Sequence, residues 1–305
     1  MHRYAINRIL QMFVTLLGVS LIAFGATSAL GDPSYFVLGD NATPEAVAQY
    51  RSANGLDRPV WEQYASFVGG MARGDLGQSF HYRQPAIQVV GTRLPATITL
   101  GVASLGLAVI LGIPLGTLAA LRRGGVSDRI ITFAAQVGQA IPGFFLGLLL
   151  IIVFAVNLRV LPTGGTGDWR NLVLPSVTLG AFLVTLIVRI TRSSVIDALG
   201  QDYVRTARAK GLSEYRTVSR HVMRNVLIAM VTVVGLQTSV LFSGAVVTET
   251  IFGWPGVGRL VAEAVFSRDF PVVRAAVMII ASAVVLMNLF VDLLYGLIDP
   301  RIKLQ

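Results

Sequence analysis

The chain has 305 residues, of which 54% are hydrophobic and 13% charged, and its formal net charge is +9. Charged residues make up about a quarter of a soluble domain, so this composition argues against a water-soluble fold. With no cysteine and three histidines, the chain has no disulfide framework and almost no soft ligands for a metal site.

Six apolar segments are long enough to cross ~30 Å of hydrocarbon, which takes ~20 helical residues. The segments are 9–30, 97–121, 130–156, 172–188, 226–248 and 275–298. The first is too long for the apolar part of a secretory signal, so we interpret it as a retained span. The sequence therefore predicts an all-α polytopic membrane protein with six transmembrane helices.

Charge predicts the orientation of these spans. The segments on the side of the N-terminus hold fifteen basic and six acidic residues, a net +9, and those on the other side hold ten of each. The positive-inside rule then places both termini in the cytoplasm. A chain that is both this basic and this apolar is expected to lie in a lipid membrane. Its positive charge therefore does not indicate nucleic acid as the natural partner.

We expect residues 1–30 to form an N-terminal segment with the first span, 31–93 an outer helical cap, and 94–305 a five-helix core.

The cap carries two helix signals. Thr43 is placed as an N-cap with Pro44 at the first helical position, and a second helix is expected to open at 57–59. The second helix has an aromatic stripe that fits either a packed core or interface anchor, or a ligand site; it consists of Trp61, Tyr64, Phe67 and Val68.

The segment 189–224 holds eight of the 25 Lys and Arg residues. Within it we expect a short helix at 201–210, ended by Gly211, which adopts a left-handed C-terminal conformation at little cost. Tyr203, Val204 and Ala207 share one side, and Arg205 and Arg208 lie on the other. A solvated positive-inside loop explains the arginines alone. The small residues beside them favour a docking helix, followed by Ser213 as the N-cap of the next helix.

Two further sets of residues suggest a transport path. Neutral polar side chains in the spans fit either interhelical hydrogen bonding or a wet, uncharged passage. The residues that we assign to the passage are Gln136, Gln139, Gln237, Ser239, Ser243 and Asn288. The stretch 253–258 cannot continue a helix, and it is either a plain turn or a re-entrant outer gate with Glu249, Trp254 and Pro255. We expect Arg189 and Asp292 at similar depth, where Asp292 pairs with Arg189 or with a cation of the partner chain; the alternative for Arg189 is to snorkel to the interface.

The missing motifs narrow the function classes. Neither lysine is followed by Ser or Thr, so the chain has no phosphate-binding P-loop, and Gly-x-Ser-x-Gly does not occur. We expect no catalytic residue, no metal site and no enzyme activity. An ion-coupled carrier usually needs ionisable groups near the bilayer midplane, which the sequence does not offer.

Several stretches resemble one family along nearly the whole chain. The sequences DYVRTARAKGL (202–212) and HVMRNVLI (221–228) are similar to the EAA-type signature of ABC-importer permeases in the dipeptide, oligopeptide and nickel branch. Further matches are NATPEAVAQYRSANGLDRPVWEQY, GDLGQSF, RLPATITLGVASLGLAVILGIPLGTLAALRRGG, GAVVTETIFGWPGVGRLVAEAVFSRDFPVV and NLFVDLLYGLIDPRIK.

This resemblance implies a type I ABC-importer permease in the bacterial cytoplasmic (inner) membrane, carrying short peptides inward by alternating access. It implies three kinds of partner: a second homologous permease, one or two ABC ATPase subunits that hold ATP and Mg, and an extracytoplasmic solute-binding protein. No cofactor is expected in this chain. Nickel or another small solute remains the alternative cargo, and an ion-coupled carrier the alternative class.

The resemblance also implies a coupling helix, at about 201–215, that sits in a groove of the ATPase. Its residues here are Asp202, Tyr203, Arg205, Thr206, Ala207, Arg208, Ala209, Lys210, Gly211 and Leu212. Two positions depart from the pattern. Arg205 stands where the signature has Glu, as in this branch, and Ala229 stands where a proline is expected, so we expect a straighter start to the fifth span.

Overall fold

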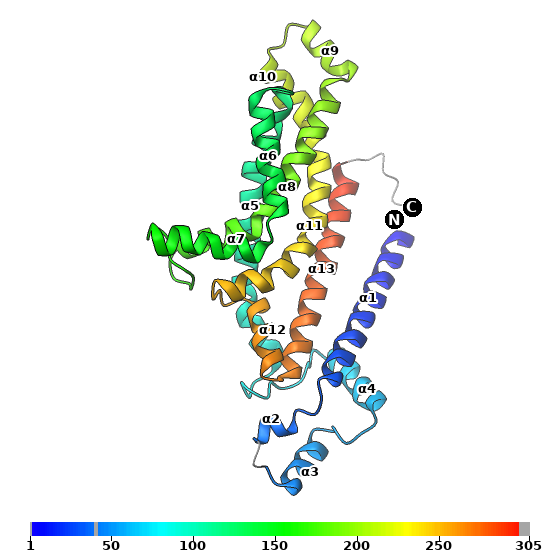
Figure 1. Cartoon of the computed structure of the whole chain (residues 1–305). Coiled ribbons are helices and arrows are strands. Elements are labelled where there is room, and N and C mark those ends of the chain that lie inside the picture. The colour runs from blue at the N-terminus through cyan, green and yellow to red at the C-terminus, as the bar shows by residue number, and fades with distance from the viewer. Residues whose placement is uncertain (1, 40–41, 299–305) are drawn as a thin grey trace. The chain divides into compact units, whose positions relative to one another are not determined.

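The computed structural model describes residues 2–39 and 42–298, without the side chains of 2–7, 9, 36, 228, 229, 232, 236, 238–240, 242, 243 and 291–298. Helices make up nearly all the regular structure of this part of the chain (Figure 1). Its one pairing of extended backbone is an isolated bridge between Gln78 and Pro85. The predicted all-α class is therefore confirmed.

The chain forms two compact units, which we describe separately. Within the described residues, the first unit comprises 2–97 and 255–289, and the second comprises 98–254 and 290–298. The expected division into 1–30, 31–93 and 94–305 stays a prediction.

The first unit contains the N-terminal helices, the start of α5 and the last two helices. They are α1 (His2–Ala29), α2 (Ser34–Leu38), α3 (Pro44–Ala53), α4 (Val60–Met71), the first turns of α5 (Ala86–Leu121), α12 (Val257–Phe266) and most of α13 (Phe270–Ile298). Its core joins α5, α12 and α13 through fully buried aliphatic side chains such as Val90, Val257 and Val272.

The cap helices begin close to where the sequence places them. Thr43 caps α3 by accepting a hydrogen bond from the backbone N–H of Ala46 at 3.3 Å, as predicted. The next helix begins at Val60 after Pro59, slightly later than expected. Its aromatic stripe divides, because Tyr64 and Phe67 pack on Phe24 of α1 whereas Trp61 is 70% exposed.

The second unit consists of the rest of α5, six further α-helices, two π-helical segments and the last described residues of α13. The further elements are α6 (Val126–Ala140), α7 (Gly143–Leu150), η1 (Ile151–Asn157), α8 (Arg170–Leu199), α9 (Asp202–Ala209), α10 (Glu214–Arg216), η2 (Thr217–Val222) and α11 (Met223–Ile251). The α11 helix runs unbroken through the backbone of Ala229.

Glycines let α5 and α8 approach closely in the second unit. A Cβ atom on Gly112 would lie 2.6 Å from Ile187, and one on Gly116 would lie 2.7 Å from Thr191. The four-residue spacing puts both glycines on one face of α5, as in the small-residue contacts of membrane helices. Buried side chains of α8, α9, η2 and α11 then form a continuous core.

One expected span is not a continuous helix. The segment 130–156 breaks after Ala140, and α6 with α7 and η1 forms a pair bent by 105°. Ile141 is extended (φ −80°, ψ 123°), the conformation that a following proline favours. Pro142, the N-cap residue of α7, has no N–H to donate to the preceding helix. The apolar segment expected here is thus a bent pair of helices, and its crossing of the membrane as one span stays a prediction.

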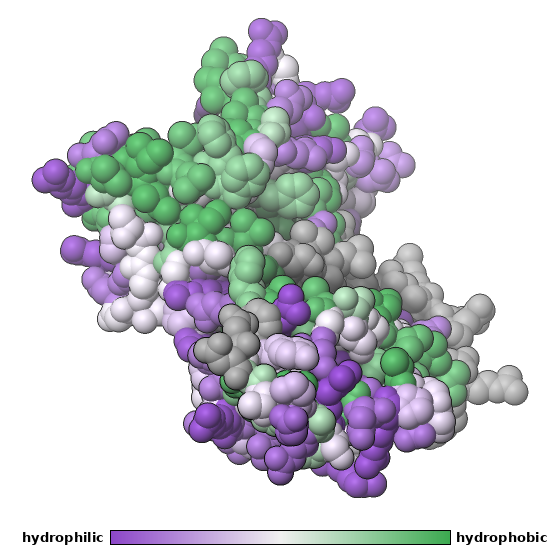
Figure 2. Space-filling model, turned by 60° about the horizontal axis from the view of Figure 1, so that its bottom comes forward, coloured by the Kyte–Doolittle hydropathy of each residue, from purple (hydrophilic) through white to green (hydrophobic). Residues whose placement is uncertain are grey.

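Four helices of the described residues are long and apolar enough to cross a membrane, and the bent pair would make a fifth. The four are Leu10–Ala29, Ala86–Leu121, Arg170–Leu199 and Phe270–Phe290. Large hydrophobic side chains are more than 60% exposed on these helices and on α6, for example Ile22, Ile110 and Phe133. Figure 2 shows broad hydrophobic (green) areas beside hydrophilic (purple) ones. Such exposure is typical of surfaces that face lipid.

Candidate functional site

The short basic helix α9 has the ends that the sequence predicts. It covers Asp202–Ala209, and Gly211 takes a left-handed φ of +78°. The backbone N–H of Gly211 donates to the carbonyl of Arg208 at 2.9 Å, and that of Leu212 donates to the carbonyl of Ala207 at 3.3 Å. This pair of bonds is a Schellman motif, which ends the helix and turns the chain sharply.

The inner face of α9 packs on its own unit. Val204 is fully buried in a cluster with Val195 of α8 and Val222 of η2, and Ala207 is 5% exposed. The prediction that Ala207 offers a small-residue face to a partner was therefore wrong, since its methyl group is covered within this chain. The hydroxyl oxygen of Tyr203 accepts a hydrogen bond from the Asn225 side chain at 2.8 Å.

The outer face of α9 is polar and open. Its exposed residues are Asp202, Arg205, Thr206, Ala209 and Lys210. Arg205 lies 3.6 Å from Asp202, and their side chains are 75% and 96% exposed, so this ion pair constrains neither group strongly. A partner that meets α9 would meet this charged face.

A second ion pair ties the end of α9 to the next turn. Arg208 donates from Nη2 and Nε to the two carboxylate oxygens of Glu214 at 2.6 and 3.1 Å. These hydrogen bonds lower the pKa of Glu214 and raise that of Arg208. Ser213 does hold the N-cap position of α10, but its side chain makes no capping bond. The exit from α9 is thus fixed by the ion pair and Gly211.

Sequence reasoning missed a largely enclosed ion pair of the second unit. Arg192 of α8 donates from Nε and Nη2 to Asp128 of α6 at 2.6 and 2.8 Å. Asp128 is 5% exposed and also accepts from the backbone N–H of Gly124 and the hydroxyl of Thr132. The two partners are 64 residues apart, so no local spacing could have revealed the pair.

Arg189 has a hydrogen-bond partner that the sequence analysis did not assign to it. Arg189 donates from Nη1 to Oε1 of Gln139 at 2.7 Å. The side chain of Asp292 lies outside the described residues, so its pairing stays a prediction. Gln139, assigned to the passage, is therefore a hydrogen-bond partner of α8.

That the other assigned residues line one passage stays a prediction. Gln136 is exposed, and the buried Oε1 of Gln237 accepts no hydrogen bond from the described residues. The side chains of Ser239 and Ser243 are not described, and Asn288 belongs to the first unit. The second unit holds an apolar cavity of about 340 Å³ between α6, α7, α8 and α11, lined by Gly138, Thr178, Phe182, Leu241, Gly244 and Thr248 among others.

The helix break expected near 253–258 is present. The α11 helix ends at Ile251, Gly253 has a φ of +60°, and the backbone N–H of Trp254 donates to the carbonyl of Glu249 at 2.8 Å. Glu249 and Trp254 are buried, while Pro255 is half-buried. A gating role for these residues stays a prediction.

A loop of the second unit is closely packed on the end of α11. The backbone N–H of Gly165 donates to the carbonyl of Phe252 at 3.0 Å, and a Cβ on Gly164 would lie 1.9 Å from that carbonyl oxygen. The ring of Phe252 reaches Gly147 of α7. Only glycine fits at position 164, and sequence reasoning did not assign it a role.

A bundle of long apolar helices, with an exposed, charged helix between two of them, is the architecture of a polytopic membrane protein. Comparisons with known proteins identify its family. The family described as "Binding-protein-dependent transport system inner membrane component" matches residues 112–304. Its N-terminal counterpart, described as "Binding-prot-dependent transport system membrane comp, N-term", matches residues 1–101. The chain belongs to this family, and its predicted location as a multi-pass inner-membrane protein is confirmed.

Curated relatives agree with this assignment over nearly their full length. The dipeptide transport system permease protein DppB of Escherichia coli strain K12 is 37% identical, with 99% of each chain covered. The glutathione transport system permease protein GsiC of Escherichia coli O6:H1 is 40% identical, again with 99% of each covered. A chain of the inward-facing MetNI methionine ABC transporter has a TM-score of 0.57 at 15% identity, covering 70% of this chain and 97% of that one. This structural likeness shows the fold.

Proposed function

We propose that this chain is the permease subunit of an ATP-driven importer that moves short peptides inward by alternating access. The proposal is supported by two relatives of nearly equal length whose names specify a dipeptide and glutathione. Both cargoes are small peptides, so the cargo class follows from sequence similarity.

The observation that carries the coupling part of the proposal is the two-sided environment of α9. One side, with Val204, is buried in its own unit, and the other presents Arg205 and Lys210 to solvent. Because α9 is packed against α8 and η2, a displacement of α9 is expected to move these two helices with it. In this proposal the ATPase subunit binds the charged face of α9. When the ATPase subunits close on binding ATP, they move α9 and the helices packed against it.

The orientation follows from charge. Six spans with both termini in the cytoplasm put α9 on the cytoplasmic face and the cap helices α2–α4 outside. The partners are a second homologous permease, one or two ABC ATPases carrying ATP and Mg, and an outer solute-binding protein. This chain itself binds no cofactor and catalyses no reaction.

The passage and gate residues keep their proposed roles with one change. Gln136, Gln237, Ser239, Ser243 and Asn288 are proposed to line the passage, whereas Gln139 is reassigned to holding Arg189. Glu249, Trp254 and Pro255 are proposed to form the outer gate at the end of α11.

Transport by the reconstituted complex tests the proposal. Proteoliposomes holding the full complex and its binding protein should take up a radiolabelled dipeptide with ATP inside, and should not do so with a proton or sodium gradient alone. Uptake driven by a gradient without ATP would overturn the proposed energy source. Uptake of Ni²⁺ in place of the dipeptide would overturn the proposed cargo.

A further inference from the structure

The first unit contains a cavity for which the family resemblance assigns no role. It has a volume of about 840 Å³ and lies among α3, α4, the turn 77–83 and the start of α13. Cavities that bind small molecules usually measure ~300–1,000 Å³, so the space suits a small ligand. Aromatic rings contribute to its wall: Phe24, Tyr50, Phe67 and Phe80.

Arg274 places a positive charge at the wall in an unusual setting. Its guanidinium carbon lies 4.3 Å from the ring centre of Phe24 and 5.6 Å from that of Phe67. Nε donates to the hydroxyl of Thr27 at 2.6 Å, and no carboxylate among the described residues lies within 4.0 Å of the group. A guanidinium has five N–H donors, so most of those of Arg274 remain for a ligand.

The Arg274 guanidinium can therefore bind an anion by donating hydrogen bonds to it. A half-buried guanidinium loses much of its hydration, and the faces of two aromatic rings offset that loss only in part. A carboxylate that enters the cavity can accept two parallel hydrogen bonds from the planar nitrogens, the geometry that Arg provides and Lys does not.

A second arginine reaches the cavity from a firmly held turn. Arg83 lines the wall and has a φ of +53°, a left-handed conformation that a residue other than glycine rarely adopts. The buried carboxylate of Asp269 fixes this turn by accepting from the Ser79 hydroxyl and from the backbone N–H groups of Phe80 and His81. Strain of this kind persists where surrounding contacts impose it, and it is enriched at ligand sites.

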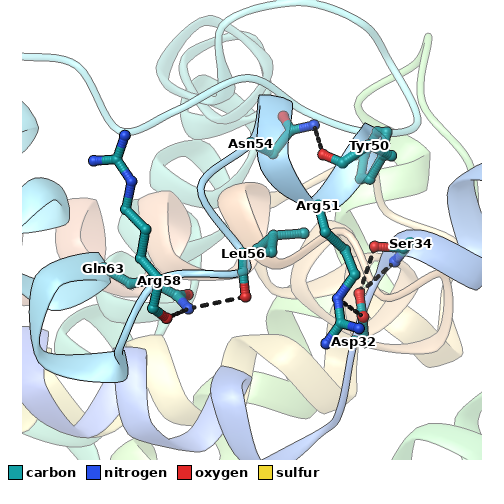
Figure 3. A network of polar contacts seen from close by, with 8 residues as sticks. All are labelled: Asp32, Ser34, Tyr50, Arg51, Asn54, Leu56, Arg58 and Gln63. Carbon is teal, nitrogen blue, oxygen red and sulfur yellow. Dashed lines mark hydrogen bonds and ion pairs between the residues drawn. The ribbon is translucent and has the colours of Figure 1, made fainter. Parts of the chain in front are cut away.

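Acidic and neutral groups complete the lining. Glu62 and Asp75 are part of the wall, and Asp75 accepts from the backbone N–H of Gly77 at 2.9 Å. Figure 3 shows the neighbouring polar network, in which Gln63 donates to the carbonyl of Arg58 while the Arg58 side chain extends away from the Asp32–Arg51 pair. The lining of this cavity thus contains cations, carboxylates and aromatic rings. This combination suits a zwitterionic ligand with an apolar side chain better than it suits a simple anion.

We propose that this cavity binds a short zwitterionic peptide, with Arg274 and Arg83 taking its terminal carboxylate and Glu62 or Asp75 its ammonium group. The aromatic rings receive the side chain. The inference rests on the proposed peptide import and on the outer position of the cap. It adds a peptide site on the permease itself, separate from the binding protein.

Protection of an introduced cysteine tests the site directly, because the native chain has none. Ser66 is exposed and lines the cavity, whereas Ser267 is exposed and does not. In the full complex without binding protein, Ala-Phe should slow maleimide labelling of Ser66→Cys and leave that of Ser267→Cys unchanged. The N-acetylated, C-amidated form of Ala-Phe, which lacks both terminal charges, should protect far less.

Charge variants give the second readout. Arg274→Gln should weaken the protection by about tenfold or more, the loss expected when a charge-assisted hydrogen bond is removed. Arg73→Gln removes an exposed arginine of the same unit that does not line the cavity, and it should not weaken protection. If Arg274→Gln prevents assembly, Arg83→Gln provides the same comparison from the turn.

The outcomes separate this inference from the proposed function. If wild-type complex imports the dipeptide but Ser66→Cys is labelled equally fast with and without peptide, the site is refuted and peptide import stands. If native mass spectrometry shows a phospholipid that is lost in Arg274→Gln and not displaced by Ala-Phe, the ligand is lipid and the proposal fails. If the complex imports no peptide at all, the proposed function itself fails.

Discussion

Arg192 and Asp128 form a two-point ion pair that joins α8 to the first turn of α6. The carboxylate also accepts from the backbone N–H of Gly124, so the turn between α5 and α6 is held by the same group. Because α8 leads directly into α9, this pair fixes the base from which the basic helix projects. Its position makes it a structural support for the proposed coupling element.

Asp128→Asn should destabilise the protein more than the loss of a surface ion pair would. Removing one partner of a buried pair costs ~3–5 kcal/mol, and the 30% exposure of the Arg192 side chain argues for the lower end. A lower melting temperature in detergent checks this. Arg192→Gln should restore part of the loss when combined with Asp128→Asn. If the two effects simply add, the residues do not act as a pair.

Substitutions on the two faces of α9 should impair different properties of the permease, ATPase binding for the exposed face and stability for the packed face. Arg205→Glu reverses an exposed charge, so the permease should insert and melt normally yet lose co-purification with the ATPase subunits. Ala207→Asp puts a carboxylate in the packed face, so it should lower the melting temperature even in the isolated permease. Normal co-purification and transport by Arg205→Glu would exclude the outer face as the docking surface.

The Arg208–Glu214 pair predicts a small pH dependence at the end of α9. Hydrogen bonds from Arg208 lower the pKa of Glu214 below its ordinary value of 4.5. The stability that the ionised Glu214 contributes is therefore fully present at pH values above 4.5, and it is lost as the pH falls through the lowered pKa. Both side chains are about half exposed, so we expect less than ~1 kcal/mol.

Hydrogen exchange provides the measurement for this pair. At pH 7, amides at 209–216 should exchange faster in Glu214→Gln than in the wild type. The two proteins should be compared at the same pH each time. The difference between their exchange rates should disappear at acid pH, where Glu214 is protonated in the wild type. A difference that stays constant down to pH 3 would mean that the carboxylate charge is not what holds this turn.

Gly164→Ala should disrupt the loop that packs on α11. A Cβ there would lie 1.9 Å from the carbonyl oxygen of Phe252, a distance that requires the backbone to move. We expect loss of the Gly165–Phe252 hydrogen bond and a lower melting temperature. Gly167→Ala is the control, since a Cβ at that position meets nothing within 4 Å although its φ of +131° adds some strain. Equal effects of the two variants would mean that the clash with Phe252 adds nothing to the general cost of an alanine in this loop.

Cysteine labelling tests the orientation. A cysteine at Ser52 in α3 should react with an impermeant maleimide added to intact spheroplasts, because the cap is expected outside. A cysteine at Ser219, which is exposed in η2, should react only after the membrane is made permeable. The reverse pattern would invert the proposed topology.

Sequence alone determined the class, the family and the ends of the short helices. Apolar stretches, Thr43, Pro44 and Gly211 act through local backbone and solvent preferences, so their consequences are readable at short range. The tertiary structure decided which faces are covered. It buried Ala207, paired Arg189 with Gln139, joined Arg192 to Asp128 and divided the aromatic stripe of α4. These outcomes depend on contacts between residues far apart in the chain, which helical periodicity does not specify. The bend at Pro142 was open to sequence reasoning in principle, but whether a proline kinks a helix or breaks it depends on the neighbours that satisfy the freed carbonyls.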